Sequence, residues 1–232
     1  MKLYLARHGE TEENLAGILA GQLPGSLSPT GIAQAQELGA LLPRLNPFII
    51  VTSDLHRAHL TSTIAAYAGG YTGNIIPDPR LREVHLGDFQ GKKEQEVKVS
   101  CQQRGLPEYG TLIHSDIRYF LAEEREPLVR SFSCEPTSHI DERLEQVIKD
   151  IIRPHAQQLG EKEGLLLVSH LAFNSYLVEK LLYGTCGINL KKRSEGGHYH
   201  QGNNELFAID FSKDGEVTKV QLNIPYAEVQ VL

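Results

Sequence analysis

Residues 2–11 read Lys2-Leu3-Tyr4-Leu5-Ala6-Arg7-His8-Gly9-Glu10-Thr11, an apolar run that ends in an arginine and a histidine. The run predicts a short strand over Lys2–Ala6, with Arg7 and His8 at its C-terminal end. In an open α/β sheet, ligands bind at this end of the strands. An arginine fork recognises phosphate or carboxylate, and a neutral imidazole beside it serves as a base, a nucleophile or a metal ligand. The pair therefore suggests an anion site suited to phosphoryl chemistry.

A second histidine stands in a matching position. His170 follows the apolar run Leu165–Val168, which predicts a central buried strand. Arg57 follows the β-branched run Phe48–Thr52 closely enough to reach the same strand ends. Each residue alone is as readily explained by a structural or solvent-exposed role. Two histidines at the ends of parallel strands, one of them beside an arginine, favour a shared crevice.

Strand-like and helix-like segments alternate along the chain, which is the pattern of a parallel sheet covered by helices. We predict an α/β three-layer sandwich with a mostly parallel central sheet and helices on both faces, formed by one domain over residues 1–232. Residues 92–137 are the least regular segment and predict an insertion over the C-terminal edge that covers the substrate. The expected strands are 2–6, 48–52, 75–76, 165–168, 205–211 and 217–222. The expected helices are one opened by Ser28 and Pro29, then about 55–67, 138–159 with a kink or an end at Pro154, and 172–182.

The composition narrows the class of protein. The net charge is −6 over 232 residues, so we expect no nucleic-acid partner, and any positive charge must be local to a pocket. Three cysteines without a C-x-x-C pair predict neither a disulfide framework nor a zinc site. No apolar run approaches the ~20 residues of a membrane span. We also expect no signal peptide before the first strand. We therefore expect a cytoplasmic protein with no membrane partner.

Five motifs in order resemble those of the histidine phosphatase superfamily, the phosphoglycerate mutase-like family, and they cover nearly the whole chain. They are R-H-G-E-T at residues 7–11 with Asn14; Gly21 with L-S-P-T-G-I-A-Q-A at 27–35; S-x-L-x-R-A-x-x-T at 53–61; L-x-E-x-x-x-G-x-F-x-G at 81–91; and V-S-H at 168–170.

This resemblance implies a role for each matching residue. His8 would be the nucleophile that becomes phosphorylated, and Glu83 the general acid for the leaving oxygen. Arg7, Arg57 and His170 would hold the phosphoryl oxygens. The implied substrate-binding residues are Asn14, Thr11, Gly21 and Leu171. Positioning and charge stabilisation dominate phosphoryl transfer, so we expect neither a metal nor another cofactor.

Two positions depart from the family's pattern. Leu171 stands where the family usually has glycine, so its side chain would narrow the pocket while its N–H could still face phosphate from a helix start. Ala20 replaces a hydroxyl residue frequent in mutases.

Three functions remain open. We favour a phosphatase acting on a small phosphorylated substrate. The resemblance implies that a mutase would carry tyrosine where Leu86 stands and an arginine pair in the insertion, whose arginines here are isolated. A phosphoglycerate mutase-type transfer is the alternative, and a non-catalytic regulator that binds a phosphorylated ligand is the third. Neither the substrate nor the oligomeric state follows from the sequence.

Overall fold

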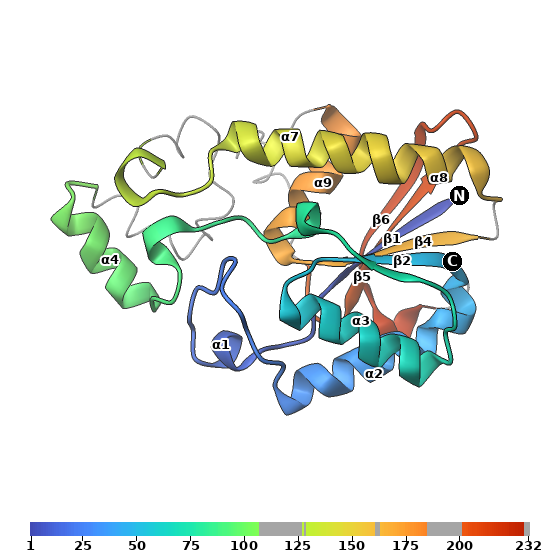
Figure 1. Ribbon diagram of the computed structural model, residues 1–232, viewed down its shortest axis with the longest axis horizontal. Coiled ribbons are helices and arrows are strands. Elements are labelled where there is room, and N and C mark those ends of the chain that lie inside the picture. The colour runs from blue at the N-terminus through green and yellow to red at the C-terminus, as the bar shows by residue number, and fades with distance from the viewer. Residues whose placement is uncertain (107–126, 128, 161–162, 185–200, 230–232) are drawn as a thin grey trace.

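Strands β1 (Lys2–Arg7) and β4 (Gly164–Ser169) lie side by side and parallel at the centre of a six-stranded sheet in the computed structural model. Both are buried along nearly their whole length because helices cover both faces of the sheet (Figure 1). The structure describes residues 1–106, 127, 129–160, 163–184 and 201–229.

The sheet has the order β3-β2-β4-β1-β5-β6. Its first four strands are parallel, whereas β5 and β6 are antiparallel to their neighbours, so the prediction of a mostly parallel α/β sheet is confirmed. Helices α2 and α3 cover one face, and α7, α8 and α9 cover the other (Figure 1). The bounds of the remaining strands are β2 (Pro47–Thr52), β3 (Ile75–Pro77), β5 (Glu205–Phe211) and β6 (Val217–Pro225). Those of the helices are α1 (Glu12–Leu15), α2 (Pro29–Leu45), α3 (His56–Gly69), α4 (Glu94–Gln103), α7 (Thr137–Val147), α8 (Arg153–Gln158) and α9 (Leu171–Tyr183).

Successive side chains of the central strands enter different cores. Leu5 and Leu167 pack into the apolar cluster that includes Phe173 of α9, while Ala6 and Val168 pack with residues of α2 and α3. This alternation follows from the two-residue period of a strand. Both faces of the central strands are therefore anchored, which fixes their register.

Local sequence signals set the helix ends. The Ser28 hydroxyl accepts a hydrogen bond from the Gly31 N–H, and Pro29 occupies the first turn of α2, as predicted. Asn46 and Gly70 end α2 and α3 in the left-handed conformation.

The segment around Pro154 differs from the expectation of a kink or an end at the proline. The α-helix is interrupted earlier, where a π-helical turn over Ile148–Ile152 follows α7. Pro154 then lies in the first turn of α8, directly after the π-helical turn, and Ile152 and Arg153 before it keep helical backbone angles. The helical path therefore continues to Gln158.

The proposed insertion, residues 92–137, is more regular than expected at its start, because it contains α4. This helix lies beyond the edge at which the parallel strands end (Figure 1). At the other end of the segment, the Phe132 ring packs 4.3 Å from the Phe89 ring, centroid to centroid. Residues 107–126 and 128 lie outside the described part of the chain.

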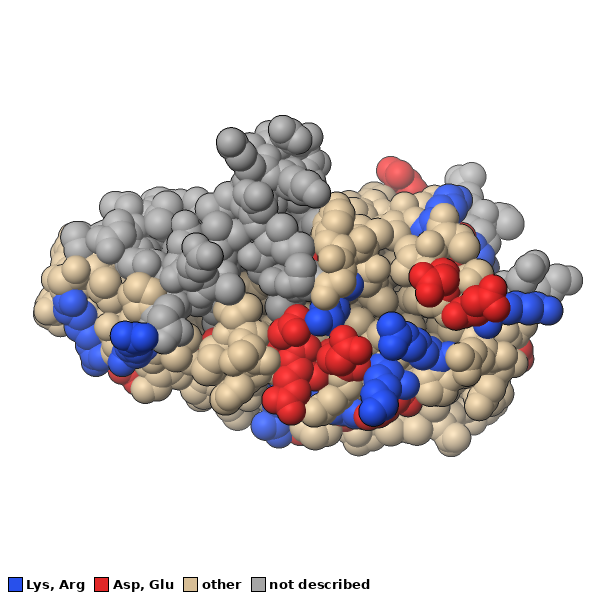
Figure 2. Space-filling view, turned by 90° about the horizontal axis from the view of Figure 1, so that it is seen from above, with Lys and Arg blue, Asp and Glu red and all other residues tan. Residues whose placement is uncertain are grey.

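Within the described ranges, no helix is long and apolar enough to cross a membrane. Acidic and basic side chains are interspersed on the face shown in Figure 2. The absence of a nucleic-acid partner stays a prediction.

Candidate active site

His8 and His170 meet at the C-terminal edge of the sheet, with ring centroids 5.1 Å apart. This proximity follows from the register, because Arg7 pairs with Ser169 and each histidine is the next residue. The His8 N–H continues the ladder by donating to the Ser169 carbonyl. The two strand ends therefore deliver both imidazoles to one point, as the sequence predicts.

The contacts of His8 fix its tautomer. Nδ1 lies 2.7 Å from the Gly9 carbonyl oxygen, which can only accept, so Nδ1 carries the proton. Nε2 then holds the lone pair and accepts a hydrogen bond from Nε of Arg57 at 3.2 Å. The lone pair of His8 thus points toward the guanidinium.

Arg57 is the second residue of α3 and is almost fully buried. Its two terminal nitrogens donate to the Leu23 and Gly21 carbonyls at 2.8 and 2.7 Å. The Arg57 carbonyl accepts from the Thr61 hydroxyl, which also accepts from the Gly9 N–H. The guanidinium is therefore held against His8 by the backbone that surrounds it.

His170 is buried and neutral. Burial lowers its pKa well below the ordinary value, and the charges of Arg57 and Arg7 and the nearby His8 lower it further. Its Nε2 lies 2.9 Å from the Ser53 hydroxyl, which accepts from the Leu55 N–H at 3.3 Å. A buried hydroxyl hydrogen requires an acceptor, and Nε2 supplies one. This assigns the His170 proton to Nδ1, which has no hydrogen-bond partner among the described residues.

Glu83 is held by the start of α9. One carboxylate oxygen accepts from the N–H groups of Val84 (3.0 Å) and Phe173 (3.2 Å), and the other from Ala172 (3.3 Å). The first-turn N–H groups of a helix lack partners within the helix, so a carboxylate binds there favourably. The start of α9, which follows His170 directly in the chain, thereby holds the Glu83 carboxylate.

The substrate-binding residues expected from the resemblance are bound to the protein itself. The Thr11 and Asn14 side chains cap the short helix α1 reciprocally. Gly21 has φ +53°, and its carbonyl faces Arg57. Leu171 begins α9 with its side chain buried. Their roles toward a substrate remain predictions.

Arg7 depends on residues that sequence reasoning missed. Its guanidinium donates to the Gln201 carbonyl at 3.1 Å. The Gln201 side chain binds the Asn174 amide and the Leu5 carbonyl. The Asn203 amide donates to the His8 carbonyl at 2.6 Å. Most of these partners are backbone atoms, which leave no pattern in a sequence.

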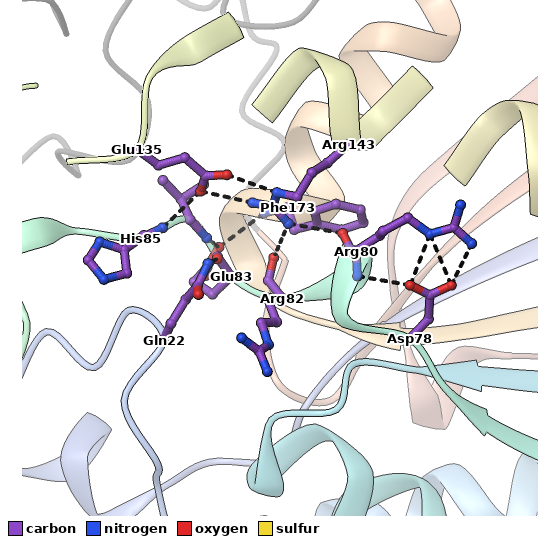
Figure 3. Close-up of polar contacts among 10 residues, drawn as sticks. Gln22, Asp78, Arg80, Arg82, Glu83, His85, Glu135, Arg143 and Phe173 are labelled. Atoms are coloured by element: carbon purple, nitrogen blue, oxygen red, sulfur yellow. Dashed lines mark hydrogen bonds and ion pairs between the residues drawn. The ribbon is translucent and has the colours of Figure 1, made fainter. Parts of the chain in front are cut away.

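A second missed group surrounds Glu83 (Figure 3). Arg143 of α7 and Glu135 form a bidentate ion pair, in which Nε and Nη2 of the arginine lie 2.8 and 2.9 Å from the two carboxylate oxygens. Both also bind the backbone on either side of Glu83. Across the described segments, His, Cys, Asp and Glu side chains form no cluster that could hold a metal ion.

Comparison with known proteins places this geometry in context. A family model described as histidine phosphatase superfamily (branch 1) matches residues 3–223. Glucosyl-3-phosphoglycerate phosphatase of Mycobacterium tuberculosis (strain CDC 1551 / Oshkosh) is 40% identical over 101 residues, 43% of this chain and 44% of that protein. The match therefore spans less than half the length of this relative.

A second relative aligns over more of the chain. Adenosylcobalamin/alpha-ribazole phosphatase of Salmonella typhimurium is 29% identical over 185 residues, 78% of this chain and 80% of that protein. The solved structure of Bacillus stearothermophilus YhfR superposes with a TM-score of 0.76 at 24% identity, covering 98% of this chain and 99% of that one. It shows the same fold.

Proposed function

Because the chain belongs to the histidine phosphatase superfamily (branch 1), we propose that it hydrolyses phosphomonoesters through a phosphohistidine on His8. The orientation of that imidazole carries the proposal. Its Nδ1 donates to the Gly9 carbonyl, so its Nε2 presents a lone pair to Arg57 in a pocket that also holds His170. A neutral nitrogen beside fixed positive charge is what attack on an anionic phosphoryl group requires.

The reaction runs in two steps. Nε2 of His8 attacks phosphorus in line as the bond to the leaving oxygen breaks, and Glu83, which enters this step in its protonated form, donates its proton to that oxygen. Glu83, now a carboxylate, then takes a proton from water, whose oxygen attacks the phosphohistidine and breaks the N–P bond. The Arg57 N–H that binds the lone pair of His8 in the free enzyme moves to a phosphoryl oxygen as attack begins. Arg7 and Nδ1 of His170 bind the other oxygens.

We propose a small, diffusible phosphorylated metabolite of the cytoplasm as the substrate. The names of the two relatives, a glucosyl-3-phosphoglycerate phosphatase and an adenosylcobalamin/alpha-ribazole phosphatase, support this class. The side chain at position 86 favours hydrolysis over mutase chemistry, because Leu86 is buried in the core and offers no hydroxyl to a substrate. A panel of phosphorylated metabolites that includes 3-phosphoglycerate and its bisphosphate identifies the compound.

Replacement of the nucleophile tests the mechanism. His8→Ala should abolish turnover of p-nitrophenyl phosphate, and wild-type protein quenched in alkali after mixing with a labelled phosphomonoester should carry phosphate on His8. His59→Ala, which removes an exposed imidazole from α3, is the matched control and should keep both properties. Full activity in His8→Ala would exclude this nucleophile.

The same trapping experiment separates the other functions. Label that is transferred to 3-phosphoglycerate rather than to water indicates a mutase. A protein that binds the labelled ester but never forms phosphohistidine is a binder rather than an enzyme.

A further inference from the structure

We infer that Arg143, together with Glu135, is a positioning residue for the acid–base group Glu83. The inference rests on the proposed role of Glu83 and extends it to two residues outside the pocket. The charge of Arg143 helps to lower the pKa of His170. The hydrogen bonds of Arg143 and Glu135 converge on the backbone that carries Glu83 (Figure 3).

Arg143 clamps the chain immediately before Glu83. Its Nη1 donates to the Arg80 carbonyl at 2.9 Å and to the Arg82 carbonyl at 2.8 Å. One planar guanidinium thus fixes two peptide groups spaced two residues apart. Lysine could not reproduce this arrangement, because its ammonium cannot bind the two carbonyls and a carboxylate in the same fork geometry.

Glu135 clamps the chain immediately after Glu83. Its carboxylate accepts from the His85 N–H at 3.0 Å, and its own N–H donates to the His85 carbonyl at 2.8 Å. Its two oxygens also bind Arg143, and its side chain is only 10% exposed. The ion pair therefore joins both clamps into one unit, with Glu83 between them.

The same unit reaches the hydrogen bonds of the Glu83 carboxylate. Cζ of Arg143 lies 5.5 Å from the centre of the Phe173 ring, and the Phe173 N–H donates to Glu83. The Glu83 carbonyl accepts from the Gln22 side chain at 2.8 Å. Residues from different parts of the chain thus bind the carbonyl of Glu83, the peptide groups on either side of it and its carboxylate.

This arrangement matters for catalysis because a proton donor must lie within hydrogen-bond reach of the leaving oxygen. A displacement of about 1 Å in a catalytic group can cost roughly a hundredfold in rate. A shift of this segment would therefore move the proton donor away from the leaving oxygen.

The kinetic test compares two leaving groups. Arg143→Gln should lower kcat/KM for an alkyl phosphate by roughly 10–100-fold, which is part of the ~10²–10⁴-fold that general acid catalysis contributes. The same variant should lower kcat/KM for p-nitrophenyl phosphate by less than about threefold, because that leaving group needs little protonation. Arg143→Lys should fall between wild type and Arg143→Gln. Glu83→Gln sets the reference pattern. Arg80→Gln is the matched control, because the Arg80 side chain pairs only with Asp78 and Asp150 in the described structure.

A second readout does not depend on activity. The amide protons of Val84 and Phe173 are bonded to the Glu83 carboxylate, so Arg143→Gln should speed their hydrogen exchange at least about tenfold while amides of β1 and β4 keep their rates. Unchanged exchange at these two amides overturns the positioning role. Faster exchange with equal losses for both esters overturns its catalytic consequence. If Glu83→Gln itself shows no preference between the esters, the proposed acid fails, and the exchange data still report whether Arg143 fixes the segment.

Discussion

His170 is a neutral imidazole placed where positive charge is concentrated. Burial lowers its pKa well below the ordinary value of 6.5, and Arg57 is the strongest of the neighbouring charges that lower it further. A neutral His170 can donate a hydrogen bond from Nδ1 to a phosphoryl oxygen without adding a charge that the pocket would have to balance. The lowered pKa of His170 should also make the free energy of unfolding depend on pH.

Below pH 6.5, the unfolded chain binds a proton at this histidine that the folded chain does not bind. The free energy of unfolding should therefore fall as pH decreases from 6.5 toward the lowered pKa, by up to about 1.4 kcal/mol per pH unit for this group. Urea unfolding of wild type and His170→Asn between pH 7.5 and 5.5 checks this. The variant should show the shallower slope.

His59→Gln, which removes an exposed imidazole, should keep the wild-type slope. Equal slopes for wild type and His170→Asn would show that the folded protein binds the proton as readily as the unfolded chain does.

At this scale, the sequence predicts which side chains lie together at the candidate site better than it predicts which residues support them. His8, His170 and Arg57 follow apolar runs, and that position alone indicates their common location. Gln201 and Arg143 act largely on backbone carbonyls. A carbonyl exists at every position, so no residue pattern marks the partner.

The backbone after His8 packs directly against the start of α2. A Cβ on Gly31 would lie 2.0 Å from the Glu10 carbonyl oxygen, and one on Gly9 2.4 Å from the Gly31 carbonyl oxygen. The Ser28 cap also donates to the Glu10 carboxylate at 2.8 Å. Two glycines thus allow the start of a helix to touch the loop that follows the proposed nucleophile.

Gly31→Ala should therefore lower stability by about 1–3 kcal/mol, the usual cost of overpacking, and should also lower kcat, because the Glu10 backbone must move. Urea unfolding and turnover of p-nitrophenyl phosphate measure the two effects. Gly160→Ala is the control, since its Cβ would meet its nearest neighbour at an ordinary 3.7 Å. A Gly31→Ala protein with wild-type stability and rate would contradict the close approach.

Element ends were predictable where a local signal sets them, as at Ser28 and Pro29 in α2. The π-helical turn over Ile148–Ile152 was not, because its apolar spacing resembles that of an ordinary helix. Helix α4 was missed for a related reason, since a short, mostly polar helix carries a weak periodic signal.

At the scale of the whole molecule, the strand order joins distant parts of the chain. The crossover that returns β4 between β1 and β2 brings residues near 8, 53 and 170 to one edge, while the helices on both faces bury the strands that hold them. The protein carries a net charge of −6, so attraction of an anion depends on this local gathering of arginines rather than on the overall field.

An anion that binds there links β1, α3 and β4 and should stabilise the entire fold. At a phosphate concentration 100 times Kd, binding adds about 2.7 kcal/mol, which for a domain of this size raises Tm by about 5–10 °C. Arg57→Gln removes the guanidinium that faces His8 and should lose most of this shift, measured against its own Tm without phosphate. Arg44→Gln removes an arginine of α2 whose described contact is the Val229 carbonyl and should keep the shift. Since phosphate also stabilises proteins by exclusion from their surface, the comparison of the two variants isolates site binding. Equal shifts in both would show that phosphate acts on the surface and that the edge formed by these strands is not an anion site.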